Sequence, residues 1–116
     1  VGFWFALEDA NKRNGCLQVA SGGQKGPLRK IFKKVDGKMI MLDINNEEFP
    51  ETDTFVEVKK GALVLLHGRL PHYSCENTSP NSRHAYTIHV IDQNSNYPNS
   101  NWLQRPDLPL KSFIND

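Results

Sequence analysis

ALVLLH, at residues 62–67, is a continuous apolar run that ends in a histidine. It lies between Gly61 and Gly68, and a run of this length between turn residues predicts a strand that is buried on both faces. Shorter apolar clusters, separated by polar turns, occur on both sides of this run. They predict further strands at residues 3–8, 16–20, 39–44, 54–58 and 85–91.

The segments between these clusters are predicted to be turns and loops. Residues 9–15 form a polar turn that ends at Gly15, and residues 68–83 are predicted to be a site-forming loop because they contain several Pro and Asn. Residues 28–35 are predicted to form either a short basic helix or an irregular arm. After residue 91 we expect an extended tail that packs through Trp102, Leu103 and Leu108. The fold class is therefore all-β, a sandwich or a jelly-roll barrel.

Composition excludes several classes of protein. The 116 residues are enough for one domain. The net charge of +1 does not indicate electrostatic binding to nucleic acid or to a membrane. No apolar run approaches the roughly 20 residues of a membrane span, and a secretory signal and a peroxisomal address are absent from the sequence, which predicts a cytoplasmic location. Cys16 and Cys75 are expected to be reduced thiols. Because Val1 already lies beside a predicted core strand, we expect the sequence to be part of a longer protein.

Four histidines are the first candidates for chemistry: His67, His72, His84 and His89. None of them belongs to a His-x-Asp pair, and taken alone each is better explained as a structural residue than as a metal ligand. By strand alternation Arg83, Ala85, Thr87 and His89 share one face. An Arg on such a face is suited to gripping a carboxylate in bidentate fashion, although a salt bridge at the rim is the simpler explanation.

Several blocks, in order along the chain, carry a resemblance to a known family. They are FWFALEDA at residues 3–10, NGCL at 14–17, KGALVLLHG at 60–68, HYS at 72–74 and SRHAYTIH at 82–89. Together they resemble the C-terminal portion of the phytanoyl-CoA dioxygenase family. The resemblance implies that residues 1–116 are the C-terminal portion of one domain of that family, with a partial double-stranded β-helix (a cupin-like jelly roll).

The resemblance also implies a cofactor and the residues that hold it. Members of the family are Fe(II)- and 2-oxoglutarate-dependent dioxygenases, in which a His-x-Asp pair and a distal His bind iron. The distal His matches His72, and the arginine that binds 2-oxoglutarate matches Arg83. Trp4, Thr87 and His89 would line the same pocket, and a plain core position is about equally favoured for Trp4. The His-x-Asp pair would fall upstream of Val1, so the chain alone is expected to be inactive toward its small-molecule substrate.

Other interpretations stay open. The chain could be a catalytically dead cupin-like domain that binds a ligand or has a structural role, or a truncated product that forms a homodimer through exposed strand edges. Residues 21–24 read SGGQ where the family often has PGSH, which leaves the substrate undetermined. The basic segment from Lys25 to Lys38 could attract the phosphates of a CoA-type substrate, but a solvated arm is the favoured interpretation.

Overall fold

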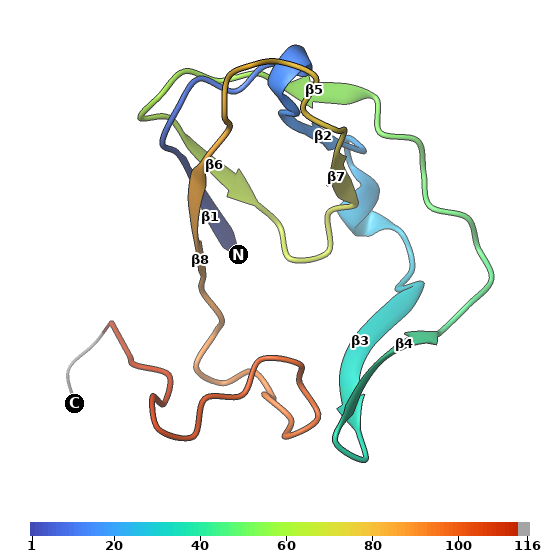
Figure 1. Ribbon diagram of the computed structural model, residues 1–116. Coiled ribbons are helices and arrows are strands. Elements are labelled where there is room, and N and C mark those ends of the chain that lie inside the picture. The colour runs from blue at the N-terminus through green and yellow to red at the C-terminus, as the bar shows by residue number, and fades with distance from the viewer. Residues whose placement is uncertain (114–116) are drawn as a thin grey trace. The chain divides into compact units, whose positions relative to one another are not determined.

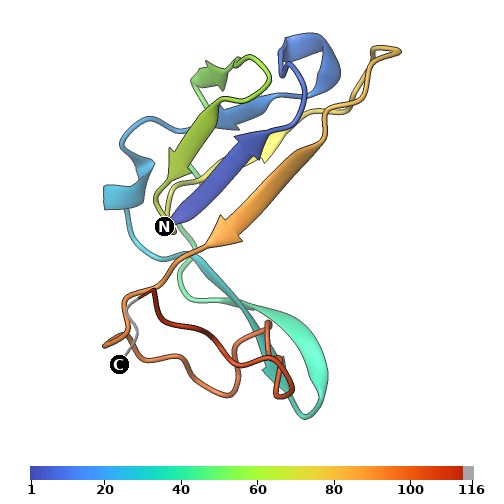
Figure 2. The same ribbon diagram turned by 90° about the vertical axis from the view of Figure 1, so that its left-hand side faces the viewer.

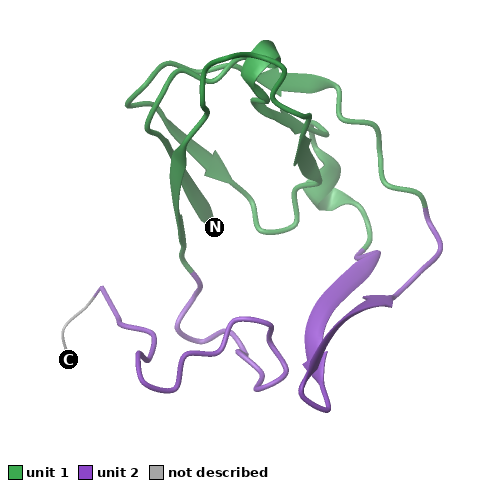
Figure 3. Ribbon diagram, in the orientation of Figure 1, with its two compact units in different colours: residues 1–27, 48–90 green, residues 28–47, 91–116 purple. Residues whose placement is uncertain are grey.

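The computed structural model describes residues 1–113, which form two compact units (Figure 3). Unit 1 comprises residues 1–27 and 48–90, and unit 2 comprises residues 28–47 and the chain from Ile91 onward. The eight strands are β1 (Gly2–Ala6), β2 (Leu17–Val19), β3 (Lys30–Val35), β4 (Lys38–Asp43), β5 (Thr54–Val56), β6 (Leu63–Leu66), β7 (His72–Ser74) and β8 (Ala85–His89). Two short 3-10 turns, η1 (Lys12–Asn14) and η2 (Gly23–Lys25), are the only helical elements among the described residues.

Two antiparallel three-stranded sheets make up unit 1 (Figures 1 and 2). The first sheet has the order β6-β1-β8, and the second has the order β5-β2-β7. The chain passes from the first sheet to the second after β1, returns at β6, and then crosses for β7 and again for β8. This winding is that of a partial double-stranded β-helix, so the predicted all-β, cupin-like fold class is confirmed.

The core lies where the inner faces of the two sheets meet. The buried cluster consists of Trp4, Ala6, Ala10, Cys16 and Leu17. Partly buried side chains packed against it are Val56, Val58, Ala62, Val64, Leu66 and Ala85. Because alternate strand residues face opposite sides, these residues identify the inner faces of β1, β2, β5, β6 and β8.

The apolar run at residues 62–67 is buried on one face only. In β6, Val64 and Leu66 pack against the core, whereas Leu63 and Leu65 are exposed. The prediction of a strand buried on both faces was therefore wrong. The reason is that β6 is an edge strand of a sheet whose second face has no covering layer among the described residues.

Unit 2 contains the β3–β4 hairpin. The prediction of a helix or irregular arm at residues 28–35 was wrong, because Ile31, Phe32 and Val35 suit a strand and pair with β4. Asp36 and Gly37 turn the chain with positive φ angles of 49° and 80°, as a tight hairpin requires.

The tail after residue 91 pairs with the hairpin through an isolated bridge between Lys33 and Asn101, where the Lys34 amide donates to the Ser100 carbonyl. Trp102 and Leu108 are exposed, so the expected packing of the tail through these two side chains is not found; Leu103 is half-buried.

Cys16 is buried and Cys75 is exposed, and both thiols are free, as expected. Among residues 1–113, none of the helical turns is long or apolar enough to cross a membrane. Sequence reasoning missed β7, which lies inside the predicted loop at residues 68–83.

Candidate functional site

His72 is the first residue of β7 and pairs with Val19 of β2. Its ring is exposed, and Nδ1 lies 2.8 Å from the Leu70 carbonyl oxygen. With the proton on Nδ1, the ring donates to this carbonyl and Nε2 keeps a free lone pair. A histidine oriented in this way through its second nitrogen is prepared to bind a metal ion.

Arg83 lies two residues before β8 and is half-buried. Its Nε donates to the Gly15 carbonyl at 2.9 Å, and its Nη2 donates to Ser74 Oγ at 3.3 Å. The guanidinium also lies over the Trp4 ring, 5.8 Å from the centroid. No carboxylate among the described residues pairs with it, so the remaining N–H groups can bind an anionic ligand.

The strand pairings place the predicted site residues on the inner side of the sheets. In β7, His72 and Ser74 alternate with Tyr73, and Ser74 is opposite the core residue Leu17. His72 and Ser74 therefore share the inner face of their sheet. Since Ser74 contacts Arg83, the metal-ligand candidate and the arginine lie on the same inner side.

The other sheet carries the residues that were predicted to line the site. Thr87 pairs with Trp4, and His89 pairs with Gly2, whose added Cβ would lie 3.8 Å from the His89 ring. Both side chains follow the inner face of Trp4 and Ala85, as the strand alternation predicts. Arg83 lies just before β8, and His89 is the last residue of β8. Thr87 and its cross-strand partner Trp4 therefore lie between them along the strand.

Asn14 and Gly15 position Arg83, and sequence reasoning missed this role. Asn14 is buried, its Nδ2 donates to the Asp9 and Ser82 carbonyls at 2.7 and 3.3 Å, and its Oδ1 accepts from the Asn11 amide at 2.7 Å. These bonds join the η1 turn to the residue just before Arg83. The Asn-Gly pair was interpreted only as a turn, because its distant partners could not be seen in the sequence.

Glu8 holds the same segment from the other side. Its carboxylate accepts from the Ser82 hydroxyl at 2.7 Å and from the His84 amide at 2.8 Å, and lies 3.2 Å from His84 Nδ1. The His84 amide and then the Ser82 hydroxyl hold the pKa of Glu8 below its ordinary value of 4.5. Arg83 is thus flanked on both sides by residues that are tied to β1 and its turn.

Comparison with known proteins decides the family. The family model described as phytanoyl-CoA dioxygenase (PhyH) matches residues 1–85, which include His72 and Arg83. The chain belongs to the phytanoyl-CoA dioxygenase family.

Curated relatives of the phytanoyl-CoA dioxygenase family match nearly the whole chain. Phytanoyl-CoA dioxygenase 1 of Oryza sativa subsp. japonica is 42% identical over 120 residues, which cover 95% of this chain and 40% of the relative. Phytanoyl-CoA dioxygenase of Arabidopsis thaliana is 38% identical over 98% of the chain and 41% of the relative. Phytanoyl-CoA dioxygenase domain-containing protein 1 of Danio rerio is 40% identical over 97% and 41%. The chain thus spans about two-fifths of the length of these relatives.

The described residues do not form a complete iron site of the kind that the phytanoyl-CoA dioxygenase family implies. Residues 1–113 contain no group of three or more His, Cys, Asp or Glu side chains that could hold a metal ion. His72 fits the part of one imidazole ligand, and Arg83 fits an anion beside it. The described residues therefore do not provide the three protein ligands that a facial triad requires.

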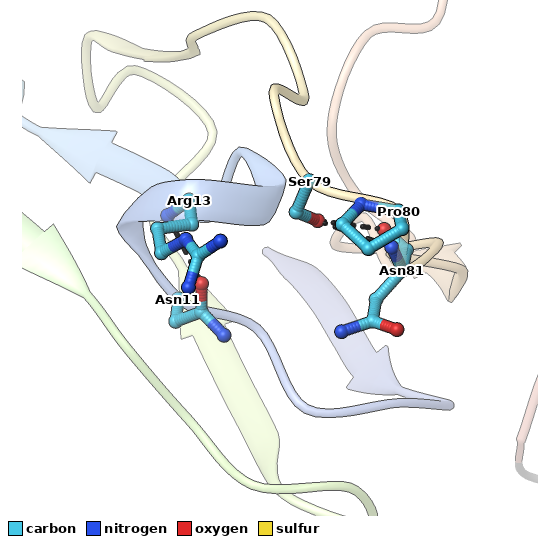
Figure 4. Close-up of a pocket in the computed structure, with 5 residues that line it drawn as sticks. All are labelled: Asn11, Arg13, Ser79, Pro80 and Asn81. Carbon is cyan, nitrogen blue, oxygen red and sulfur yellow. Dashed lines mark hydrogen bonds between the residues drawn. The ribbon is translucent and has the colours of Figure 1, made fainter.

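A shallow pocket of about 250 Å³ lies between the η1 turn and the loop at residues 77–82 (Figure 4). Its lining residues are Asn11, Arg13, Ser79, Pro80 and Asn81. None of these belongs to the predicted site, so this pocket is separate from the His72 and Arg83 side chains.

Glu8→Gln is expected to remove part of the pH dependence of stability. The pKa of Glu8 is lower in the folded protein than its ordinary value of 4.5, so the ionised carboxylate stabilises the fold above pH 4.5. This stabilisation is lost as the pH falls through the lower pKa of the folded state. The wild-type melting temperature should fall between about pH 5 and about pH 3 more steeply than that of Glu8→Gln. Glu51→Gln is the control, since Glu51 is an exposed carboxylate away from this segment; equal slopes for wild type and Glu8→Gln would contradict the prediction.

Proposed function

We propose that this chain is the C-terminal part of an Fe(II)- and 2-oxoglutarate-dependent dioxygenase that hydroxylates a small molecule. The observation that carries the proposal is the placement of His72 and Arg83 on one inner side, with Arg83 half-buried and without a carboxylate partner among the described residues. A half-buried guanidinium without a counterion is suited to binding an anion. Membership of the phytanoyl-CoA dioxygenase family supports 2-oxoglutarate as that anion.

Each residue has a separate role in this proposal. His72 would bind the iron through Nε2, with the Leu70 carbonyl fixing the orientation of the ring. Arg83 would bind the far carboxylate of 2-oxoglutarate, and the Gly15 carbonyl and Ser74 hydroxyl fix the guanidinium for this contact. Trp4, Thr87 and His89 would line the pocket. Iron, when bound with 2-oxoglutarate and oxygen, supplies the oxidising chemistry.

The apolar core beneath these residues would keep water away from the reacting groups. Trp4 packs with Ala6 and Leu17 in the buried cluster, directly beside Arg83. A low-dielectric wall strengthens the attraction between a guanidinium and a carboxylate. Arg83 would therefore bind an anion more tightly than an arginine on the open surface does.

We further propose that the chain alone does not turn over substrate. One imidazole does not hold iron firmly, and the sequence has no His-x-Asp pair. A longer polypeptide that carries this chain, with the region that the relatives have outside the match, would provide the other two ligands. The substrate would be a small molecule.

Conversion of 2-oxoglutarate to succinate tests the proposal. The longer polypeptide should form succinate only with added Fe(II), and the 116-residue chain should form none. An inert longer polypeptide that binds no iron would refute the dioxygenase function. In that case the rival function, a cupin-like binding domain without catalysis, gains support, since residues 1–113 contain no complete metal site.

Arg83→Ala in the longer polypeptide is expected to weaken 2-oxoglutarate binding. Hydrogen bonds to a charged group each contribute about 1.5–3 kcal/mol, so the concentration of 2-oxoglutarate for half-maximal rate should rise about 10- to 100-fold. Arg13→Ala is the matched control, because Arg13 is an exposed arginine that lines the separate pocket. An unchanged requirement for 2-oxoglutarate in Arg83→Ala would show that Arg83 is a structural residue.

A further inference from the structure

The turn between β6 and β7 carries the carbonyl group that orients His72. Residues 67–70, called the β6–β7 turn below, are closed by the Leu70 amide, which donates to the His67 carbonyl at 3.0 Å. The Leu70 carbonyl oxygen lies 2.8 Å from His72 Nδ1. Because the ring donates to this carbonyl, the position of the turn decides the direction in which Nε2 points. A group that fixes the turn therefore acts on His72 without touching it.

Arg69 ties the β6–β7 turn to a segment 43 positions earlier in the chain, where its Nη2 donates to the Gly26 carbonyl. Gly26 directly follows the η2 turn, and its amide donates to the Gly23 carbonyl at 3.1 Å, so the acceptor belongs to a hydrogen-bonded turn. Arg69 is exposed and has no acidic partner among residues 1–113. The hydrogen bond to Gly26 is therefore the contact that restrains its guanidinium.

The same two segments meet at a second place. The Ala20 amide donates to the Pro71 carbonyl at 3.0 Å, and a Cβ added to Gly23 would lie 2.9 Å from Pro71 Cδ. Gly23 thus leaves the space that the proline ring occupies. Contacts on both sides of the Leu70 carbonyl, at Arg69 before it and at Pro71 after it, hold the β6–β7 turn against the segment that follows β2.

We propose that Arg69 is a positioning residue for His72. Its hydrogen bond to Gly26 fixes the β6–β7 turn, the turn fixes the Leu70 carbonyl, and this carbonyl holds the proton of the imidazole on Nδ1. Nε2 is then kept free and aimed in one direction. The inference rests on the function proposed above, in which His72 binds iron through Nε2. Partners that orient a metal ligand typically contribute about 10- to 100-fold to metal affinity or activity.

The other explanation for Arg69 is that it only stabilises an exposed loop. A surface hydrogen bond with that role would change the melting temperature slightly and would leave the His72 ring unaffected. The two explanations therefore differ in what happens to the ring. The protonated nitrogen of the ring can be observed without iron, so this difference can be measured whether or not the metal binds.

Nitrogen NMR of the iron-free longer polypeptide, made with isotope-labelled histidine and measured with the ring neutral, tests the proposal. The signals of His72 are those that are missing from His72→Ala. The wild type should carry the proton mainly on Nδ1. Arg69→Met removes the donor and keeps the alkyl stem, so the proton should shift toward Nε2. Arg69→Lys keeps a donor for the Gly26 carbonyl and should stay close to the wild type.

Iron affinity, measured by calorimetry with Fe(II) under anaerobic conditions, should change in parallel. We expect Arg69→Met to bind iron about 10-fold more weakly than the wild type. With iron at saturation, its requirement for 2-oxoglutarate should not change, because Arg83 is untouched. Arg13→Met is the matched control, since Arg13 is an exposed arginine that lines the separate pocket. It should leave the His72 ring and the iron affinity unchanged.

Gly23→Ala disturbs the same contact without altering Arg69. The added Cβ would push Pro71 away from the η2 turn. The proton of the His72 ring and the iron affinity should therefore shift in the same direction as in Arg69→Met.

An unchanged His72 ring and an unchanged iron affinity in Arg69→Met would overturn the proposal. Equal losses in Arg69→Met and Arg69→Lys would also overturn it, because the hydrogen-bond donor would then not be the cause. Formation of succinate by the wild type tests the dioxygenase function separately. If the wild type forms succinate and Arg69→Met keeps the ring and the iron, only the positioning role fails. If the wild type binds no iron, the dioxygenase function fails and the ring still shows whether Arg69 positions His72.

Discussion

Gly15→Ala is expected to cause a large loss of stability, because both the backbone conformation and the space at Gly15 exclude a Cβ. Gly15 has a φ angle of 77°, a left-handed conformation that residues with a Cβ adopt at a cost. In addition, an added Cβ would lie 2.6 Å from the Cys75 carbonyl oxygen, a backbone atom that cannot rotate away. We expect a loss of about 3 kcal/mol or more in the free energy of unfolding, measured by urea denaturation.

The same substitution should disturb the candidate site, because the Gly15 carbonyl accepts the hydrogen bond from Arg83 Nε. Moving the backbone away from Cys75 would move this acceptor. Gly15→Ala should therefore also weaken the binding of 2-oxoglutarate by a longer polypeptide, provided that enough of the protein stays folded to measure it.

Gly22→Ala separates the two causes of this loss. Gly22 lies in the same unit and has nearly the same φ angle, 75°, but nothing lies within 4 Å of its added Cβ. It should lose only the conformational part, about 1 kcal/mol. If the two variants unfold at the same urea concentration, the close approach at Cys75 contributes nothing and the argument for Gly15 fails.

Local pattern predicted the inner face of the first sheet well. Alternation from Arg83 through Thr87 to His89 is a property of a single strand, and the structure places Thr87 and His89 opposite Trp4 and Gly2 on the inner side. The strand at residues 85–91 needed no knowledge of its partners, because its own apolar and β-branched residues specify it. This is why the sequence could place these candidate residues on one face.

Elements that depend on distant partners were not predicted. β7 has three residues within a segment of turn-forming residues, and it is a strand because Leu17 and Val19 pair with it from more than 50 positions away. β3 is rich in lysine, and its strand state comes from pairing with β4. Short-range propensity is weak in β7, and in β3 the lysines obscure the strand-forming residues, so tertiary pairing decides the outcome.

The supports of the candidate site were also hidden in the sequence. Ser74 and Asn14 are common polar residues, and only their contacts with Arg83 and Ser82 give them a role. The run at residues 62–67 was misjudged for a related reason. Hydrophobicity shows that Leu63 and Leu65 favour a covered surface, but it does not show which layer covers them.

His72→Ala is expected to abolish iron-dependent formation of succinate by a longer polypeptide that carries this chain. Loss of an outer-shell partner of a metal ligand typically costs about 10- to 100-fold in affinity or activity, and loss of the ligand itself should cost more. His72 is exposed, and among residues 1–113 its ring has one hydrogen-bond partner, the Leu70 carbonyl. The melting temperature of the variant should therefore stay close to that of the wild type.

Iron binding, measured by calorimetry with Fe(II) under anaerobic conditions, distinguishes a ligand from a residue that only lines the pocket. His72→Ala should bind iron much more weakly than the wild type, because the variant lacks Nε2, the β7 atom whose lone pair would bind the metal. His67→Ala is the matched control, because His67 is also an exposed histidine. His67 follows the last residue of β6, and its Nδ1 accepts a hydrogen bond from the Arg69 amide at 3.1 Å. It should keep both iron binding and turnover. Full iron affinity in His72→Ala, or equal losses in the two variants, would show that His72 is not a specific ligand of the iron.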